Sequence, residues 1–208
     1  MPVTRPPRGR LDKRQAILEA AAEVFGALGY ERASIDAIAE AAGVSKPTIY
    51  SHFGTKEQLF RDSIAESAAR VNAESMEAIV ALDVTTDRWR EALYTLAEAL
   101  VQCQRSPCAQ SLQRQIHAEV TRDPEVFDAV RARAITPIHE ALAGRLAMLG
   151  NAGVLRVPDP HLAARQFIAL IGAQLPELTR FGTRDVGDAE IAAAVRAGVD
   201  TFLAAFAA

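Results

Sequence analysis

The chain has 208 residues, of which 50% are hydrophobic and 24% are charged, and its formal net charge is −3. This composition is typical of a folded globular protein and argues against disorder throughout the chain. Two cysteines are too few for a disulfide framework, and the apolar runs are far shorter than the about 20 residues that span a bilayer. We therefore expect a cytoplasmic protein that does not associate with membranes.

Charge is distributed unevenly along the chain. Residues 1–61 carry nine Lys or Arg against seven Asp or Glu, whereas residues 62–208 carry fourteen against nineteen. Five of the basic groups fall in the first fourteen residues, and we predict that residues 1–10 form a basic flexible arm. A basic head on an acidic body is typical of a phosphate-contacting segment joined to another module. A solvated tail with no binding role fits the charge equally well.

Apolar residues recur at three- and four-residue spacing along the whole chain, which predicts an all-α fold of about nine helices. In the N-terminal part, helices are expected over residues 11–28, 34–42 and 45–53, followed by one continuous helix of about 25 residues from Lys56. Further helices are expected over about 87–104, from Pro107, over about 124–146, from Pro160, and from Asp188. We predict a three-helix domain over residues 11–55 and a second helical domain over residues 56–208.

The segment from Ser34 to Lys56 has the spacing of a helix-turn-helix, because two short helices are joined by Ala42-Gly43-Val44-Ser45. An ordinary pair of antiparallel helices fits the turn equally well, so the outer face of the second helix decides between them. With Ile49 and Phe53 directed inward, that face carries hydroxyl, lysine and apolar groups suited to a DNA major groove. The predicted DNA-binding residues are Ser34, Ser45, Lys46, Pro47, Thr48, Tyr50, Ser51, His52 and Lys56.

A series of short motifs spans residues 11–60. They are Ile17-Leu18-Glu19-Ala20-Ala21, Val24-Phe25, Gly29-Tyr30, Ala33-Ser34-Ile35, Ile38-Ala39, Ala42-Gly43-Val44-Ser45, Thr48-Ile49-Tyr50, His52-Phe53 and Lys56-Glu57-Gln58-Leu59-Phe60. In order and spacing they resemble the DNA-binding domain of TetR/AcrR-type transcriptional regulators. A fainter resemblance links residues 115–127 to the effector domains of AefR-like members.

The resemblance implies a sequence-specific DNA-binding regulator, a repressor that releases its operator when a small molecule binds. Its implied partners are a palindromic double-stranded operator, a small apolar or amphipathic effector and a second copy of the chain. Lys46, Pro47 and Thr48 would lie nearest the bases, whereas Tyr50 and His52 would contact the DNA backbone, as would Ser34 and Lys56. Packing against the first helix is the alternative for Tyr50, and a plain surface position is the alternative for His52. A helical scaffold that binds protein remains the alternative function.

Apolar stripes on the middle helices contain the candidate effector-binding residues. Core packing explains most of these side chains, and the resemblance implies that some of them line a cavity. They are Trp89, Leu96, Leu100, Cys103, Leu112, Ile116, Phe127 and Ile135. Cys103 and Cys108 lack a second cysteine pair, so we expect no zinc, and inert thiols are favoured over redox sensing. No nucleophile–base spacing or phosphate loop is present, so we expect neither an enzyme nor a cofactor.

The last two expected helices carry more apolar surface than one neighbouring helix would cover. We predict that two copies of the chain join them in a four-helix bundle with two-fold symmetry. The predicted interface residues are Phe167, Ile171, Leu175, Ile191, Val195, Val199 and Phe202. The alternative is that both helices bury these side chains within one chain.

Overall fold

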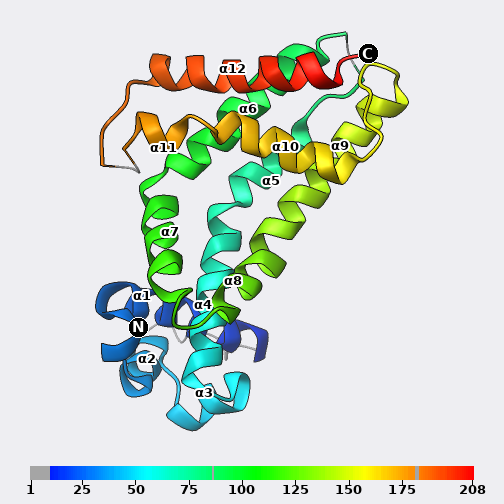
Figure 1. Ribbon diagram of the computed structural model, residues 1–208. Coiled ribbons are helices and arrows are strands. Elements are labelled where there is room, and N and C mark those ends of the chain that lie inside the picture. Colours follow the sequence, from blue (N-terminus) through cyan, green and yellow to red (C-terminus); the bar gives the residue numbers. More distant parts are fainter. Residues whose placement is uncertain (1–9, 86, 181–182) are drawn as a thin grey trace, which may run out of the picture. The chain divides into compact units, whose positions relative to one another are not determined.

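The computed structural model describes residues 10–85, 87–180 and 183–208. Over these ranges the chain forms helices α1 to α12 and one π-helical segment, η1, and its only extended pairing is an isolated bridge between Leu155 and Ala207 (Figure 1). The all-α prediction is confirmed. Residues 1–9 of the expected basic arm lie outside the described residues. None of the described helices combines the length and hydropathy that a membrane span requires.

The first of two compact units contains the chain up to Ala69 together with Arg114–Arg133. Its helices are α1 (Arg10–Arg32), α2 (Ile35–Ala42), α3 (Lys46–Phe53), most of α4 (Lys56–Val71) and α8 (Glu125–Val130). Phe25 and Phe60 meet in its core with ring centroids 4.9 Å apart and edge-to-face geometry, and Tyr30 and Phe53 are buried aromatic residues of the same unit. The α1 helix ends its regular course at Gly29, whose φ of 75° lies in the left-handed region.

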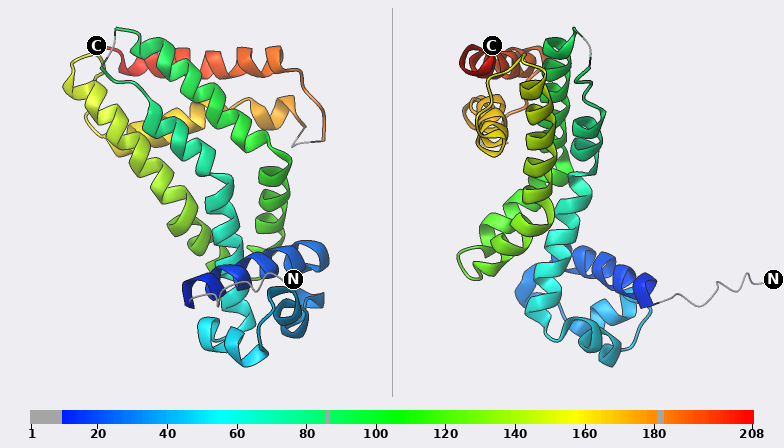
Figure 2. Two further views of the ribbon diagram at one scale, coloured as in Figure 1. Left: turned by 180° about the vertical axis from the view of Figure 1, so that it is seen from behind. Right: turned by 90° about the vertical axis from the view of Figure 1, so that its right-hand side faces the viewer.

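The second unit contains Arg70–Gln113 and Ala134–Ala208. Its helices are α5 (Ala73–Ala81), α6 (Trp89–Arg105), the first half of α7 (Pro107–Glu119), α9 (Thr136–Asn151), α10 (Pro160–Gly172), α11 (Leu175–Leu178) and α12 (Asp188–Phe206). Helices α10 and α12 run side by side (Figures 1 and 2). Phe167 and Phe202 meet between them, with ring centroids 5.1 Å apart. The two backbones approach closely at Gly198, where there is no room for a Cβ atom.

Two of the expected helices are interrupted. The continuous helix expected after Lys56 breaks at Asn72 into α4 and α5, and the Asn72 amide donates a hydrogen bond to the Ala134 carbonyl at 3.1 Å. The helix expected over residues 124–146 divides into α8, η1 (Arg131–Ile135) and α9. Pro137 lies at the start of α9 and has no N–H to donate to the turn before it, so regular α-helical bonding cannot continue there.

Candidate nucleic-acid interface

Helix α2 and the turn that follows it have the geometry of a helix-turn-helix. Ser34 caps α2, since its hydroxyl accepts a hydrogen bond from the backbone N–H of Ala37 at 3.1 Å. The helix ends at Gly43, whose φ of 65° and ψ of 37° are left-handed, and the Val44 N–H donates to the Ala39 carbonyl at 3.0 Å. Glycine suits this position because a side chain with a Cβ atom is strained at such a φ. The turn therefore leads directly into α3.

Helix α3 is anchored by one face and open on the other. Ile49 and Phe53 are buried, with 1% and 6% exposure, as the sequence pattern predicts. The opposite face is open, and Tyr50 is 44% exposed. Of the other predicted contact residues, Ser34, Ser45, Lys46, Pro47 and Ser51 are exposed, and Thr48, His52 and Lys56 are half-buried. All nine belong to the first unit, and α3 with the residue before it carries seven of them.

Polar groups at the start of α3 pair with one another. The hydroxyls of Ser45 and Thr48 are 2.8 Å apart, and Ser51 donates to the Thr48 carbonyl at 2.9 Å. Lys46 forms an ion pair with Asp36 of α2 at 3.1 Å, and both side chains are exposed. An exposed pair contributes about 0–1 kcal/mol, so Lys46 can leave Asp36 at little cost.

Lys56 begins α4 and lies over an aromatic ring. Its ammonium is 4.4 Å from the centroid of the Tyr30 ring, and the Tyr30 hydroxyl donates to the Glu57 carboxylate at 2.7 Å. Burial and this hydrogen bond raise the pKa of Tyr30 to about 12, so the hydroxyl keeps its proton. The same bond lowers the pKa of Glu57, which keeps its charge. Sequence reasoning selected Lys56 and missed the support from Tyr30 and Glu57, although both lie in the motifs of residues 11–60.

An ion-pair network ties α4 to the segment Arg114–Arg133. Arg61 is 2.7 Å from Asp123 and also pairs with Glu125 at the start of α8. Asp123 is buried and additionally accepts the backbone N–H of Glu125. These residues hold the start of α8 against the helix that follows the helix-turn-helix.

The predicted effector-binding residues are divided between the two units. Trp89, Leu96 and Leu100 are buried in the core of the second unit, whereas Phe127 belongs to the first unit and is 43% exposed. The remaining four are partly buried, and they are Ile116 in the first unit and Cys103, Leu112 and Ile135 in the second.

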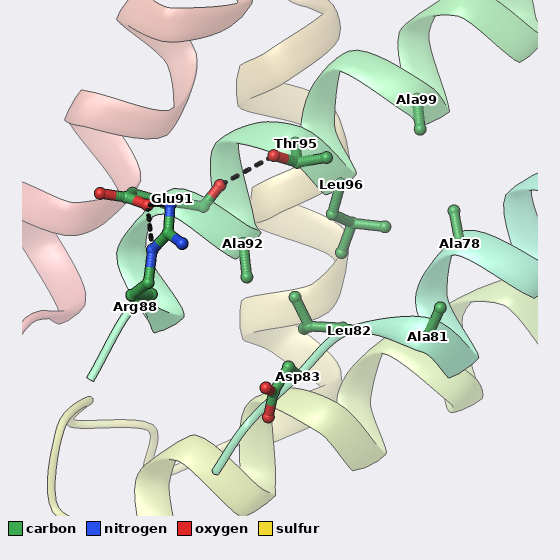
Figure 3. Close-up of a pocket in the computed structure, with 10 residues that line it drawn as sticks. All are labelled: Ala78, Ala81, Leu82, Asp83, Arg88, Glu91, Ala92, Thr95, Leu96 and Ala99. Atoms are coloured by element: carbon green, nitrogen blue, oxygen red, sulfur yellow. Dashed lines mark hydrogen bonds and ion pairs between the residues drawn. The ribbon is translucent and has the colours of Figure 1, made fainter. Parts of the chain in front are cut away.

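A pocket of about 510 Å³ lies between α5 and α6 in the second unit (Figure 3). Ala78 and Ala81 of α5 and Ala92 and Ala99 of α6 line it, and Leu96 is the predicted effector residue on its wall. The other lining residues are Leu82, Asp83, Arg88, Glu91 and Thr95. Sequence reasoning missed the four alanines because alanine is the commonest choice for any helix and carries no chemical signal.

The residues predicted for the dimer interface lie mainly inside one chain. Six of them have exposures of 2% or less, and Leu175 is partly buried. The six are Phe167, Ile171, Ile191, Val195, Val199 and Phe202. This is the placement of the alternative, in which α10 and α12 cover each other's apolar faces within the chain. Any contact with a second copy would use other faces of these helices.

The cysteines lie in the second unit and are not joined to each other. Cys103 is partly buried with its Sγ 3.6 Å from a Glu74 carboxylate oxygen, and Cys108 is exposed. In the part of the chain that the structure describes, no three His, Cys, Asp or Glu residues are grouped as metal ligands.

Comparison with known proteins identifies both halves of the chain. Residues 17–62 match the family model of bacterial regulatory proteins of the tetR family, and residues 91–208 match that of the AefR-like transcriptional repressor C-terminal domain. The transcriptional repressor AcnR of Corynebacterium efficiens is 30% identical over 150 residues, which cover 72% of each chain.

Solved structures agree with the sequence relatives. A TetR-family regulator from Mesorhizobium loti has a TM-score of 0.84 and 27% identity, covering 97% of this chain and 100% of that one. The flavonoid-responsive regulator FrrA has a TM-score of 0.76 and 30% identity, covering 94% and 97%. TetR-family regulators bind DNA operators and form dimers. The chain is therefore a DNA-binding transcriptional regulator that belongs to the TetR family and carries a C-terminal domain of the AefR-like type.

Proposed function

We propose that the protein is a ligand-responsive repressor that binds a palindromic operator as a homodimer and releases it when a small molecule binds the second unit. The observation that carries the proposal is the exposed polar face of α3, anchored from behind by Ile49 and Phe53. The match of residues 91–208 to a repressor C-terminal domain supports the direction of regulation.

The proposed DNA contacts follow from the exposure of α3. Lys46, Pro47 and Thr48 form its first turn and would meet base edges in the major groove, where lysine and hydroxyl groups can hydrogen-bond and proline can pack on a thymine methyl group. Tyr50 is open to solvent and would bind a phosphate through its hydroxyl. Lys56, with its ammonium held over Tyr30, would bind another phosphate. His52, Ser34, Ser45 and Ser51 complete the proposed contact set.

A palindromic operator presents its two half-sites in successive major grooves, which are roughly 34–36 Å apart on one side of the DNA. Two copies of the helix-turn-helix are needed to fill both half-sites. We place the interface on the outer faces of α10 and α12, since their inner faces are already buried. Leu162 of α10 is 43% exposed, and Ala193 and Ala197 of α12 are exposed. Leu162→Glu together with Ala197→Glu should therefore separate the subunits without unfolding them. Light scattering and circular dichroism would measure both properties.

The pocket between α5 and α6 is our candidate for the effector site. Its volume of about 510 Å³ falls in the range of pockets that take drug-sized molecules. Alanine walls allow a flat ring system to approach the helix backbones, and the Arg88–Glu91 pair at 2.6 Å offers hydrogen-bonding groups near one end. Because the similar regulator FrrA is flavonoid-responsive, planar polyphenols are the first class of molecule to test.

Release requires the effector to bind the DNA-free arrangement more tightly than the DNA-bound one, because a ligand shifts an equilibrium only by its difference in affinity for the two states. A polyphenol that lowers operator affinity must then bind more weakly to the protein–operator complex by the same factor. Isothermal titration with and without operator would measure this reciprocity.

The experiment that tests the proposed function is selection of bound duplexes from a random-sequence library. We expect enrichment of a palindrome whose half-sites are one helical turn apart, and loss of binding when an effective polyphenol is added. Filling the pocket with Ala92→Phe should abolish the response to the polyphenol while leaving operator binding unchanged. Ala73→Phe, at the exposed first residue of α5 and outside the pocket lining, is the matched control for added bulk. Absence of any enriched sequence would contradict operator binding and favour a protein-binding scaffold.

A further inference from the structure

The Tyr30 ring receives two cations from distant parts of the chain. The Lys56 ammonium lies 4.4 Å from the ring centroid, and the Arg122 guanidinium carbon lies 3.9 Å from it. Cations over an aromatic face are attracted by its negative quadrupole, more strongly where solvent is excluded. Tyr30 is 8% exposed, so these contacts are made at a ring largely removed from water.

Two other neighbours also contact the ring and help to orient it. Its hydroxyl donates to Glu57 at 2.7 Å, and Phe60 meets it edge-to-face with centroids 5.0 Å apart. Arg122 is in turn held by α7, since its Nε donates a hydrogen bond to Glu119 of that helix at 2.8 Å. A continuous series of contacts therefore runs from Glu119 through Arg122 and Tyr30 to Lys56.

We propose that Arg122 is a positioning residue for DNA binding, which packs on Tyr30 and so holds the ring that keeps the Lys56 ammonium in place for a phosphate. The inference rests on the proposed function, in which Lys56 contacts the operator. A lysine side chain loses rotamer freedom when it binds, and a lysine already held over a ring loses less. Removing Arg122 uncovers the ring, lets it tilt, and returns that freedom to Lys56.

The position of Arg122 in the chain gives this arrangement a regulatory meaning. It belongs to the segment Arg114–Arg133, which the chain enters from the second unit through the continuous helix α7. A change in the course of α7 that moves Glu119 or Arg122 would therefore shift the Tyr30 ring, and with it the Lys56 ammonium that is proposed to contact DNA. No residue of α3 has to move for the affinity to fall.

The test is a double-mutant cycle on the duplex selected with the wild-type protein. We expect Arg122→Gln to weaken binding about fivefold when Lys56 is present, as partial loss of lysine ordering would. In the Lys56→Ala background the same substitution should change affinity by less than about 1.5-fold, as expected when two changes remove one interaction. Arg122→Lys, which keeps a cation for the ring, should restore most of the affinity.

Arg131→Gln is the matched control. It removes the same charge from the same segment, where Arg131 pairs with Asp128 at 2.8 Å, whereas the described cations over the Tyr30 ring are Lys56 and Arg122. We expect this control to leave affinity and the cycle unchanged. Thermal unfolding of each variant separates a loss of folded protein from a loss of affinity.

Three outcomes would overturn the inference. Equal weakening by Arg122→Gln in both backgrounds would mean that Arg122 acts on its own, through a phosphate of its own or through folding. Equal weakening by Arg131→Gln would mean that only net charge matters. No weakening at all would mean that Lys56 is held without Arg122. Failure of the wild-type protein to select any duplex would instead refute the proposed function.

Discussion

Gly198 lies where α12 packs against α10, and replacing it with alanine adds one methyl group at a tight contact with the α10 backbone. A Cβ atom there would be 2.4 Å from the Leu170 carbonyl oxygen and 2.8 Å from the Ile171 Cα. Both neighbours are backbone atoms of a packed helix, so neither can rotate away. The helices must move apart by about 1 Å to bring the oxygen contact to 3.4 Å.

The cost follows from what lies between the two helices. Opening their interface by about 1 Å forfeits a quarter to a half of the dispersion energy at each atom pair, and overpacked cores typically lose about 1–3 kcal/mol. The Phe167 and Phe202 rings, 5.1 Å apart, are among the affected groups. Better helix propensity returns about 0.5–1 kcal/mol. We expect a net loss of about 1–2 kcal/mol and a Tm lower by about 2–8 °C.

Urea unfolding followed by circular dichroism is the assay, and Gly144→Ala is the control. Gly144 is an exposed helical glycine of α9, and apart from its chain neighbours and its own helix backbone no described atom lies within 4 Å of an added Cβ. That variant should gain about 0.5–1 kcal/mol of stability. If Gly198→Ala proves as stable as Gly144→Ala, the two helices do not pack as closely as the structure shows.

Three further predictions concern the first unit and α9. Ser34→Ala removes the cap of α2 and should lower the free energy of unfolding by about 1 kcal/mol in urea titrations. Arg61→Met leaves the buried Asp123 carboxylate unpaired and should cost about 3 kcal/mol, more than Arg131→Gln at an exposed pair, in the same assay. Burial, together with the charge of Arg165, lowers the pKa of His139 below its usual 6.5, so the unfolded chain takes up that proton first on acidification. Stability should therefore fall as the pH drops below about 6.5, and less so in His139→Gln, when unfolding is compared at about pH 7.5 and about pH 5.5.

The helix-turn-helix could be predicted because its signals are local. Gly43 marks a left-handed turn, and the four-residue spacing of Ile49 and Phe53 identifies the buried side of a short helix. Once the buried side is known, the exposed side follows, so the candidate contact residues can be named from the sequence alone. The cap at Ser34 is likewise set by its own backbone and the next turn.

Features that depend on contacts between distant residues could not be predicted. The structure brings Gly198 of α12 close to α10, but the sequence cannot say whether α12 meets α10 of its own chain or of a second copy. The break at Asn72 is linked to a hydrogen bond with Ala134, and the support of Lys56 depends on Arg122. Such partners are chosen by the folded arrangement, and helical periodicity carries no information about them.

A salt titration of binding tests most directly whether the face of α3 and the start of α4 bind operator DNA. Fluorescence anisotropy would follow a labelled selected duplex and a scrambled duplex between about 50 and 200 mM salt. We predict that log K falls linearly with log salt, that Tyr50→Phe weakens binding to the selected duplex, and that Lys56→Ala also weakens it and lowers the slope by about one unit. Equal affinity for both duplexes, with affinity and slope untouched by either substitution, would contradict the account.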